Sequence, residues 1–168
     1  MPDAYPLASL LSVRQFREET AKRNVSHAQT AVREAKQFVE QKKAELESWR
    51  LWRREETDRR YAGLIGQTVK IEQIDAFHHG LALLAAQELQ KESEVGEALK
   101  AVERSEAALA KAQNEVSTAR KNTAKIEAHK AIWDEESKKA AERAEDLEFE
   151  EFKPMKPLGE SSEDNDIQ

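Results

Sequence analysis

The chain has 168 residues, of which 36% are charged and 39% hydrophobic, and its formal net charge is −6. Ala, Glu, Lys, Leu and Arg dominate, which favours long helices, and an aromatic content of 6% is too low for a sizeable globular core. The acidic balance argues against nucleic-acid binding, and the absence of cysteine excludes disulfides. With no signal-peptide pattern in residues 1–20 and no run of roughly 18 apolar residues, we expect a soluble, cytoplasmic protein of one domain without membrane insertion.

The first predicted helix spans about 7–62 and follows an N-terminal extension, residues 1–6. Pro6 suits the start of a helix, where its missing N–H is not needed. The apolar residues of this helix recur at alternating spacings of four and three, which is typical of a coiled-coil seam facing a partner helix. The seam consists of Ala21, Val25, Ala28, Val32, Ala35, Val39, Leu46 and Trp49, with Lys42 as its one charged member.

The sequence AGLIGQT, residues 62–68, predicts a turn at about 63–66, because it holds two glycines in a long stretch without proline. A second helix then spans about 67–151, with Thr68 as its candidate cap. The same alternation of spacings runs along this helix. Its seam consists of Val95, Ala98, Val102, Ser105, Leu109, Ala112, Val116, Ala119, Thr123, Ile126, Lys130, Trp133, Ser137, Ala140, Ala144 and Leu147. The two seams predict an all-α fold, a long two-helix antiparallel coiled-coil hairpin.

The two predicted helices are unequal, at about 80 Å and about 125 Å. Reflection about the turn places Trp49 opposite Gly80 and leaves residues 123–151 without a partner in the chain. The seam nevertheless continues to Leu147, so we expect an external partner there, with self-association or a solvated helix as alternatives. The last segment, residues 153–168, has two prolines and an acidic end, which predicts a disordered acidic tail.

The sequence gives little indication of catalytic or metal-binding chemistry. No phosphate-binding loop, zinc-protease pattern or esterase pattern occurs. His78 and His79 are adjacent, so on a helix their side chains point about 100° apart and are poorly placed to bind one ion. We therefore expect no enzyme activity, no cofactor and no metal site.

The stretch WRLWRREETDRR, residues 49–60, combines two tryptophans with five arginines. Its acidic residues leave a local charge of only about +2, and the i,i+4 spacings predict the pairs Glu55–Arg59 and Glu56–Arg60. Three interpretations stay open: a seam tryptophan beside paired surface charges, a protein-binding patch, or a nucleic-acid surface.

The stretch IEQIDAFHHGLALLAAQEL, residues 71–89, is more apolar than one seam requires. It could form a wider seam that packs over the tryptophans of the first helix. It could also form an exposed apolar patch near the turn, where a partner docks. The two interpretations are compatible with each other.

Two segments resemble a known family. The first is YPLASLLSVRQFRE at residues 5–18, and the second is EAHKAIWDEESKKAAERAEDLEFEEF at residues 127–152. The opening YPL with a following Leu-Leu, and the spacing of His129, Lys130 and Trp133 before an acidic helix, carry the resemblance. Together with the hairpin, they resemble the YscO/SctO family of type III secretion stalk proteins, which are relatives of flagellar FliJ.

The resemblance implies a non-catalytic central stalk of the export apparatus. Its members insert into a hexameric ATPase ring and contact the cytoplasmic domain of the export gate, and some bind secretion chaperones. Two other functions remain as alternatives: a generic coiled-coil scaffold, and a helical arm that binds nucleic acid through residues 50–60.

The resemblance also implies which residues make contacts. Its gate-binding pattern on the second helix is an aromatic residue, Leu at +4 and a small apolar residue at +7, and Leu84 is larger than that last residue. The residues implied to contact the gate are Tyr61, Phe77, Leu81, Leu84 and Trp52. The residues implied to contact the ATPase or another partner, at the far end, are His129, Lys130, Trp133 and Leu147.

Overall fold

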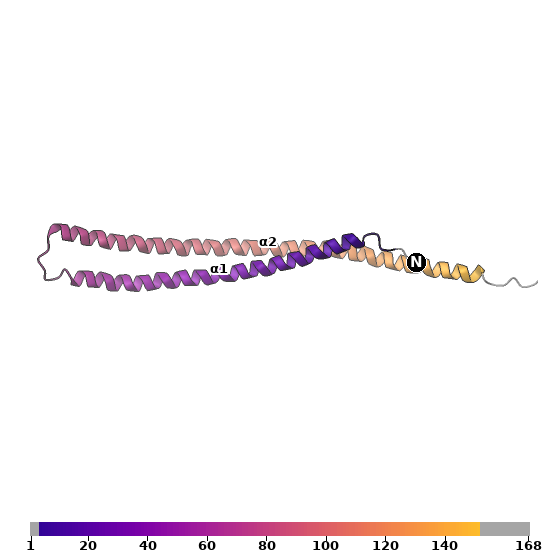
Figure 1. Ribbon diagram of the computed structural model, residues 1–168, viewed down its shortest axis with the longest axis horizontal. Coiled ribbons are helices and arrows are strands. Elements are labelled where there is room, and N and C mark those ends of the chain that lie inside the picture. Colours follow the sequence, from indigo (N-terminus) through magenta and orange to yellow (C-terminus); the bar gives the residue numbers. More distant parts are fainter. Residues whose placement is uncertain (1–3, 152–168) are drawn as a thin grey trace, which may run out of the picture.

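Two long helices make up almost all of the computed structural model, which describes residues 4–151. Helix α1 spans Ala8–Ala62 and helix α2 spans Ile71–Glu151, and they run side by side in opposite directions (Figure 1). At 1.5 Å per residue, their lengths are about 82 Å and about 121 Å. The predicted all-α antiparallel hairpin is therefore confirmed, whereas the predicted tail, residues 153–168, lies outside the described residues. Neither of these two helices has a segment apolar enough to cross a membrane.

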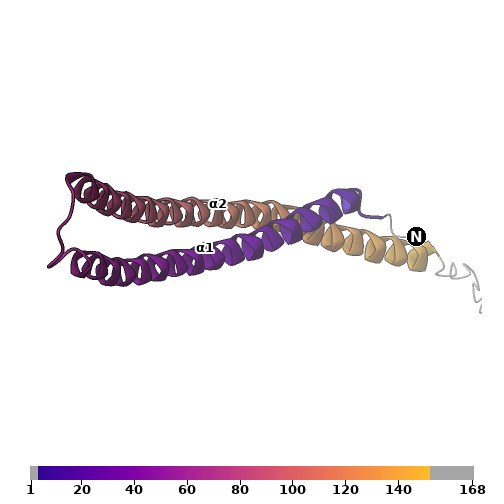
Figure 2. The ribbon, with the colours of Figure 1, turned by 60° about the vertical axis from the view of Figure 1, so that its left-hand side comes forward.

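The core of the hairpin is the narrow seam between its helices. The spacing of the buried residues is seven from Val32 through Val39 to Leu46, and fourteen from Leu84 through Ala98 to Ala112. Every seam position predicted on α1 is buried or half-buried, and so is every predicted position on α2 as far as Ser137. The heptad interpretation is therefore confirmed along the paired part of the hairpin. The views in Figures 1 and 2 show α1 crossing over α2 near its N-terminal end, as expected for supercoiled helices.

Lys42, the charged member of the α1 seam, keeps its ammonium group at the edge of the seam. Its Nζ lies 3.0 Å from a carboxylate oxygen of Glu45 and 3.0 Å from one of Glu94 on α2. The aliphatic part of a lysine can cover apolar surface while its charged end stays solvated or paired. The seam therefore continues through this position without burying an unpaired charge.

The connection between the helices is longer than predicted. It occupies residues 63–70 instead of about 63–66, and α2 begins at Ile71 instead of about residue 67. Gly66 has a φ of 80°, in the left-handed region that glycine adopts without steric cost. The chain thus leaves α1 through a turn and then runs on to Lys70 before the next helix starts.

Lys70, rather than Thr68, occupies the cap position of α2. The side-chain oxygen of Gln73 accepts a hydrogen bond from the backbone N–H of Lys70 at 2.8 Å. The carbonyl oxygen of Lys70 in turn accepts the first bonds of the helix, from the N–H groups of Gln73 and Ile74 at 3.0 and 3.3 Å. This is one half of a capping box, and the predicted Thr68 cap is wrong because the glutamine supplies the cap from inside the helix.

The longer connection shifts the pairing of the two helices. Trp49 lies against Lys91, whose Nζ is 5.6 Å from the indole centroid, so the predicted pairing of Trp49 with Gly80 is wrong. At the other end, Tyr5 contacts Ile126 and His129, which were predicted to have no partner in the chain. The segment without an α1 neighbour is therefore shorter than predicted: it begins after Trp133 instead of at residue 123.

Candidate interaction surfaces at the two ends of the hairpin

The tip of the hairpin carries a cluster of apolar side chains from both helices and from their connection. The rings of Tyr61 and Phe77 meet edge to face, with centroids 4.9 Å apart and an interplanar angle of 73°. Tyr61 is 48% exposed, and Phe77 and Leu81 are half-buried. Three isoleucines near them are exposed: Ile65, Ile71 and Ile74. We call these six residues the tip surface.

Only three of the five residues predicted to contact the gate lie in the tip surface. Tyr61, Phe77 and Leu81 belong to the tip surface, whereas Leu84 is only 5% exposed and packs in the seam. Trp52 is exposed but lies nine residues before Tyr61, about 14 Å along α1. Sequence reasoning missed Ile65, and the available signal was an isoleucine in a glycine-flanked turn, where no seam requires it.

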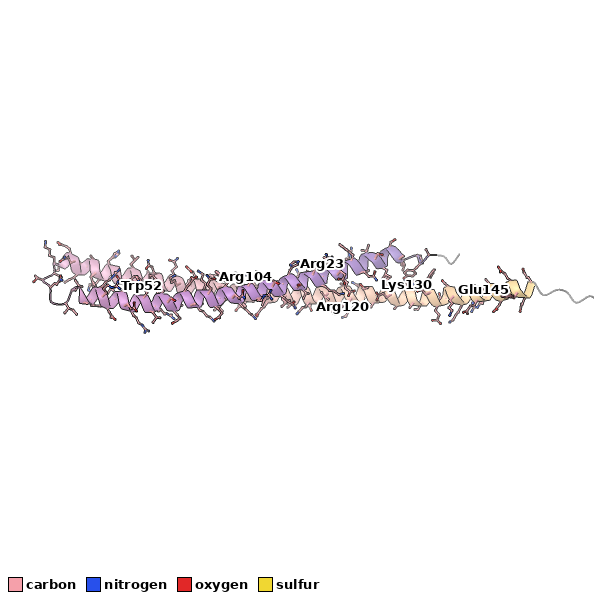
Figure 3. The ribbon with its side chains drawn as sticks, turned by 60° about the horizontal axis from the view of Figure 1, so that its bottom comes forward. Arg23, Trp52, Arg104, Arg120, Lys130 and Glu145 are labelled. Atoms are coloured by element: carbon pink, nitrogen blue, oxygen red, sulfur yellow. The ribbon has the colours of Figure 1, made fainter. Side chains whose placement is uncertain are left out.

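A second aromatic pair lies farther from the tip. The rings of Trp49 and Trp52 have centroids 4.7 Å apart, and they line a shallow groove with Lys91 (Figure 3 labels Trp52). The indole N–H of Trp49 is buried without a hydrogen-bond partner among the described residues. Trp49 thus lies at the seam, as predicted, and Trp52 extends from it toward solvent.

The arginines of residues 49–60 are engaged mainly in ion pairs. Arg50 donates to three carboxylates, those of Glu47 at 2.8 Å, Glu88 at 2.9 Å and Glu92 at 2.6 Å. Arg53 also donates to Glu88, so two arginines of α1 converge on one glutamate of α2. The contacts with Glu88 and Glu92 cross the seam, and they hold the pairing of the helices near the tip.

Glu56 accepts hydrogen bonds from the last two arginines of the stretch, from Arg59 at 2.7 Å and from Arg60 at 2.8 Å. The predicted pair Glu56–Arg60 is confirmed, while Arg59 pairs with Glu56 instead of Glu55. Four of the five arginines therefore have carboxylate partners within the hairpin. This arrangement favours paired structural charge over a surface for phosphate groups.

These ion pairs give the hairpin an acid-sensitive component. The hydrogen bond from Arg50, with help from Arg53, lowers the pKa of Glu88, and Arg60 lowers the pKa of Glu56. A lowered pKa in the folded state contributes stability above the pKa of the unfolded chain, and that stability is lost as the pH falls through the lowered value.

We expect the melting temperature to fall as the pH is lowered from neutral through the range in which glutamate titrates. Glu88→Gln should lower the melting temperature at neutral pH and flatten this acid-induced fall, because the amide has no charge to lose. Thermal melts followed by circular dichroism over a pH series will measure both effects. Glu103→Gln, at an exposed position of the same helix, is the control, and an identical pH profile for the two variants would contradict the assignment.

At the other end of the hairpin, Tyr5 holds the beginning of α1 onto α2. Its side chain is 7% exposed, and its hydroxyl lies 2.9 Å from Nδ1 of His129 and donates to the carbonyl oxygen of Ile126 at 3.4 Å. Its ring meets that of Trp133 edge to face, with centroids 5.5 Å apart. We call this the Tyr5 clasp. The sequence marked Tyr5 as part of a family resemblance but gave no sign of this contact.

The Tyr5 clasp divides the four residues predicted at the partner-facing end. His129 and Trp133 belong to the clasp, and Lys130 lies between them on α2, half-buried (Figure 3). Leu147 lies fourteen residues beyond Trp133, about 21 Å farther along the helix, and it is 63% exposed. We call the end of α2 that extends past the clasp, residues 134–151, the projecting segment. Glu145, labelled in Figure 3, lies in it.

Residues 4–151 contain no group of three or more histidine, aspartate or glutamate side chains arranged to hold a metal ion. The candidate interaction surfaces of the hairpin lie at its two ends: the tip surface at one end, and the Tyr5 clasp with the projecting segment at the other.

Comparison with known proteins assigns this hairpin to a family. The model of the type III secretion protein YscO matches residues 7–155, nearly the whole hairpin, so the chain belongs to the YscO family of type III secretion proteins. The crystal structure of YscO from Vibrio parahaemolyticus is similar, with a TM-score of 0.82 and 24% identity over 88% of this chain and 92% of that one. A YscO homologue from Chlamydia trachomatis has a TM-score of 0.69 and 21% identity over 89% and 91% of the two chains. At these identities the two structures support the fold alone. No curated protein sequence gives a significant match.

Proposed function

We propose that this protein is a non-catalytic stalk or adaptor of a type III secretion export apparatus, which links the hexameric ATPase to the export gate on the cytoplasmic side of the inner membrane. Membership of the YscO family supports the secretion system. The observation that carries the linking role is that one hairpin, about 120 Å long, has two chemically unlike ends. A generic scaffold would not need an exposed aromatic and isoleucine cluster at one end and an unaccompanied acidic helix at the other.

The tip surface is the part of the hairpin that we propose for the gate. Large exposed apolar side chains, with an aromatic pair at their centre, are typical of protein-binding patches on soluble proteins. Tyr61 offers both an apolar ring and a hydroxyl, and its ring is already held in place by Phe77. A pre-ordered side chain loses little conformational entropy when the partner binds.

The opposite end is the part that we propose for the ATPase, through His129, Lys130, Trp133 and Leu147. The hairpin separates the two surfaces by most of its length, so one molecule can contact two rings at the same time. Secretion chaperones are a third class of partner in this proposal. The nucleic-acid alternative loses support because four of the five arginines that suggested it have carboxylate partners.

The test is the binding of the cognate export-gate cytoplasmic domain to the wild-type protein and to tip variants. Tyr61→Ala alone, and Tyr61→Ala combined with Phe77→Ala and Leu81→Ala, should weaken binding by at least about tenfold, as loss of a central interface anchor typically does. Calorimetry or surface plasmon resonance gives the dissociation constants, and circular dichroism checks that helicity is retained.

Phe38→Ala is the matched control, because Phe38 is also a large exposed residue but lies in the middle of α1. Its gate binding should equal that of the wild type. If the tip variants bind the gate as tightly as the control does, or if the wild type does not bind it, the proposed role of the tip is wrong.

A further inference from the structure

The seam of α2 continues past the point where α1 stops covering it. Beyond Trp133 it runs through Ser137, Ala140, Ala144 and Leu147, with the same alternation of four and three that governs the paired part. The last three of these residues are exposed, whereas their counterparts inside the hairpin are buried or half-buried. Figures 1 and 2 show α2 extending beyond α1 in both views. The projecting segment therefore has the geometry of half a coiled coil.

The positions beside this seam are mainly acidic. Where a second helix packs on a seam, the residues that flank it on one helix face those that flank it on the other. Along the projecting segment the flanking residues are Asp134, Glu136, Ala141, Arg143, Glu148 and Glu150, four acids against one base. Its two lysines pair instead with Glu135 and Glu142, at 2.7 and 3.8 Å, away from the seam.

The hairpin itself shows what such acidic positions face. Within the paired part, Glu106 of α2 meets Lys36 of α1 at 2.8 Å, and Glu94 meets Lys42 at 3.0 Å. Glu92, also at a flanking position, meets Arg50, and so does Glu88, which lies in the seam itself. Arg120 with Glu18 is the one pair between the helices that has the opposite polarity. From Glu88 to Glu106, α2 thus presents acids to the bases of α1, and the projecting segment again carries acids beside its seam.

Charge also decides between the possible occupants of this seam. Residues 134–151 hold nine acidic and three basic residues, a net charge of −6. Pairing two copies of the segment would place acids opposite acids, which destabilises a coiled coil. The acids also lie at the C-terminal end of α2, where they oppose the helix dipole, and cations on a partner would offset this.

We infer that the projecting segment binds a basic amphipathic helix of a partner protein. This helix would take the position along α2 that α1 does not reach, with its apolar residues against Ala140, Ala144 and Leu147 and its lysines or arginines opposite the flanking acids. This inference rests on the proposed function, since it specifies the chemistry of the partner that binds the second end of the stalk. It differs from that function in requiring neither the gate nor the ATPase for its test.

The probe is a synthetic helical peptide of about three heptads, with leucine and alanine in the seam and lysine at the flanking positions. A second peptide has the same seam and glutamate at the flanking positions. We expect the full-length protein to bind the lysine peptide at least about tenfold more tightly, in fluorescence anisotropy, and to lose much of this preference at high salt.

Variants of the full chain assign the binding to the segment. Leu147→Asp should weaken binding of the lysine peptide by about tenfold or more, because it places a charge in the seam. Glu142→Lys, on the far side of the same helix, should change it by less than about threefold. Charge reversal at Glu136, Glu148 and Glu150, each to lysine, should switch the preference to the glutamate peptide.

Three outcomes would overturn the inference: no binding of either peptide, equal binding of both, or a wild-type dimer in solution that Leu147→Asp converts to a monomer. Binding of the export-gate domain to the Leu147→Asp variant is measured as well, because this binding tests the proposed function independently of the lysine peptide. Gate binding retained without any binding of the lysine peptide by the wild type would reject the partner helix and leave the role of the tip intact.

Discussion

Leu84→Ala is expected to lower the free energy of unfolding by about 2–3 kcal/mol, whereas Leu83→Ala is expected to lower it by less than about 0.5 kcal/mol. The two leucines are adjacent in α2, but Leu84 is 5% exposed and Leu83 is 55% exposed. Removing the buried side chain loses its transfer free energy and leaves a gap in the seam, while the exposed one loses little on truncation. Chemical denaturation followed by far-UV circular dichroism will measure the difference.

The pair of variants is its own control, because chemistry, helix and sequence neighbourhood are the same. Equal losses for the two leucines would mean that another face of α2 packs in the seam. The result also bears on the tip, since the family resemblance names Leu84 as a gate contact. Its burial implies that an effect of Leu84→Ala on gate binding would arise from looser pairing near the tip, so Tyr61→Ala is the cleaner test of the surface itself.

The fold was predictable from sequence because its signal is periodic and repeated. Each turn of a coiled coil needs an apolar residue on the same stripe, so a single deviation such as Lys42 does not obscure the pattern. The same pattern extends from Val95 to Leu147 whether or not a partner helix is present. The spacing therefore shows where a seam exists but not where its partner ends.

The pairing of the helices was not predictable from the same pattern. A shift of seven residues leaves a heptad seam equally apolar, so side chains outside the seam select the register. Here the cap formed by Gln73 at Lys70 sets the length of the connection, and the bonds from Arg50 and Arg53 to Glu88 hold the resulting alignment. Each of these contacts depends on one or two side chains, so it leaves no periodic pattern in the sequence from which it could be predicted.

The candidate surfaces show a similar division. Exposed isoleucines at a turn, and an unpaired seam flanked by acidic residues, follow from sequence once the ends of the helices are known. The edge-to-face contact of Tyr61 with Phe77 and the separation of Trp52 from them depend on the register, so they needed the structure. The same holds for Tyr5, which lies 124 residues from His129 in the sequence.

Tyr5→Ala is expected to remove about 2–3 kcal/mol of protection from the first turns of α1, and Tyr5→Phe about 1 kcal/mol. The alanine variant loses the buried ring, its contact with Trp133 and both hydrogen bonds, whereas phenylalanine keeps the ring and loses only the bonds. Because these contacts lie at the end of the hairpin, the loss should be local. Hydrogen exchange of the amides in residues 8–20 measures it, with the amides around Val39 as the internal reference.

Comparison of the wild type with Tyr5→Phe and Tyr5→Ala shows whether Tyr5 stabilises the start of α1. Protection should fall from wild type through Tyr5→Phe to Tyr5→Ala near the start of α1, and it should stay unchanged around Val39. Equal exchange in all three proteins would show that Tyr5 does not hold α1 in place.

If protection falls in this order, Tyr5→Ala also uncovers Trp133 and thereby lengthens the free seam of α2. The lysine peptide, extended by one heptad, should then bind this variant more tightly than it binds the wild type, because the seam surface around Trp133 that Tyr5 covers in the wild type becomes available to the peptide.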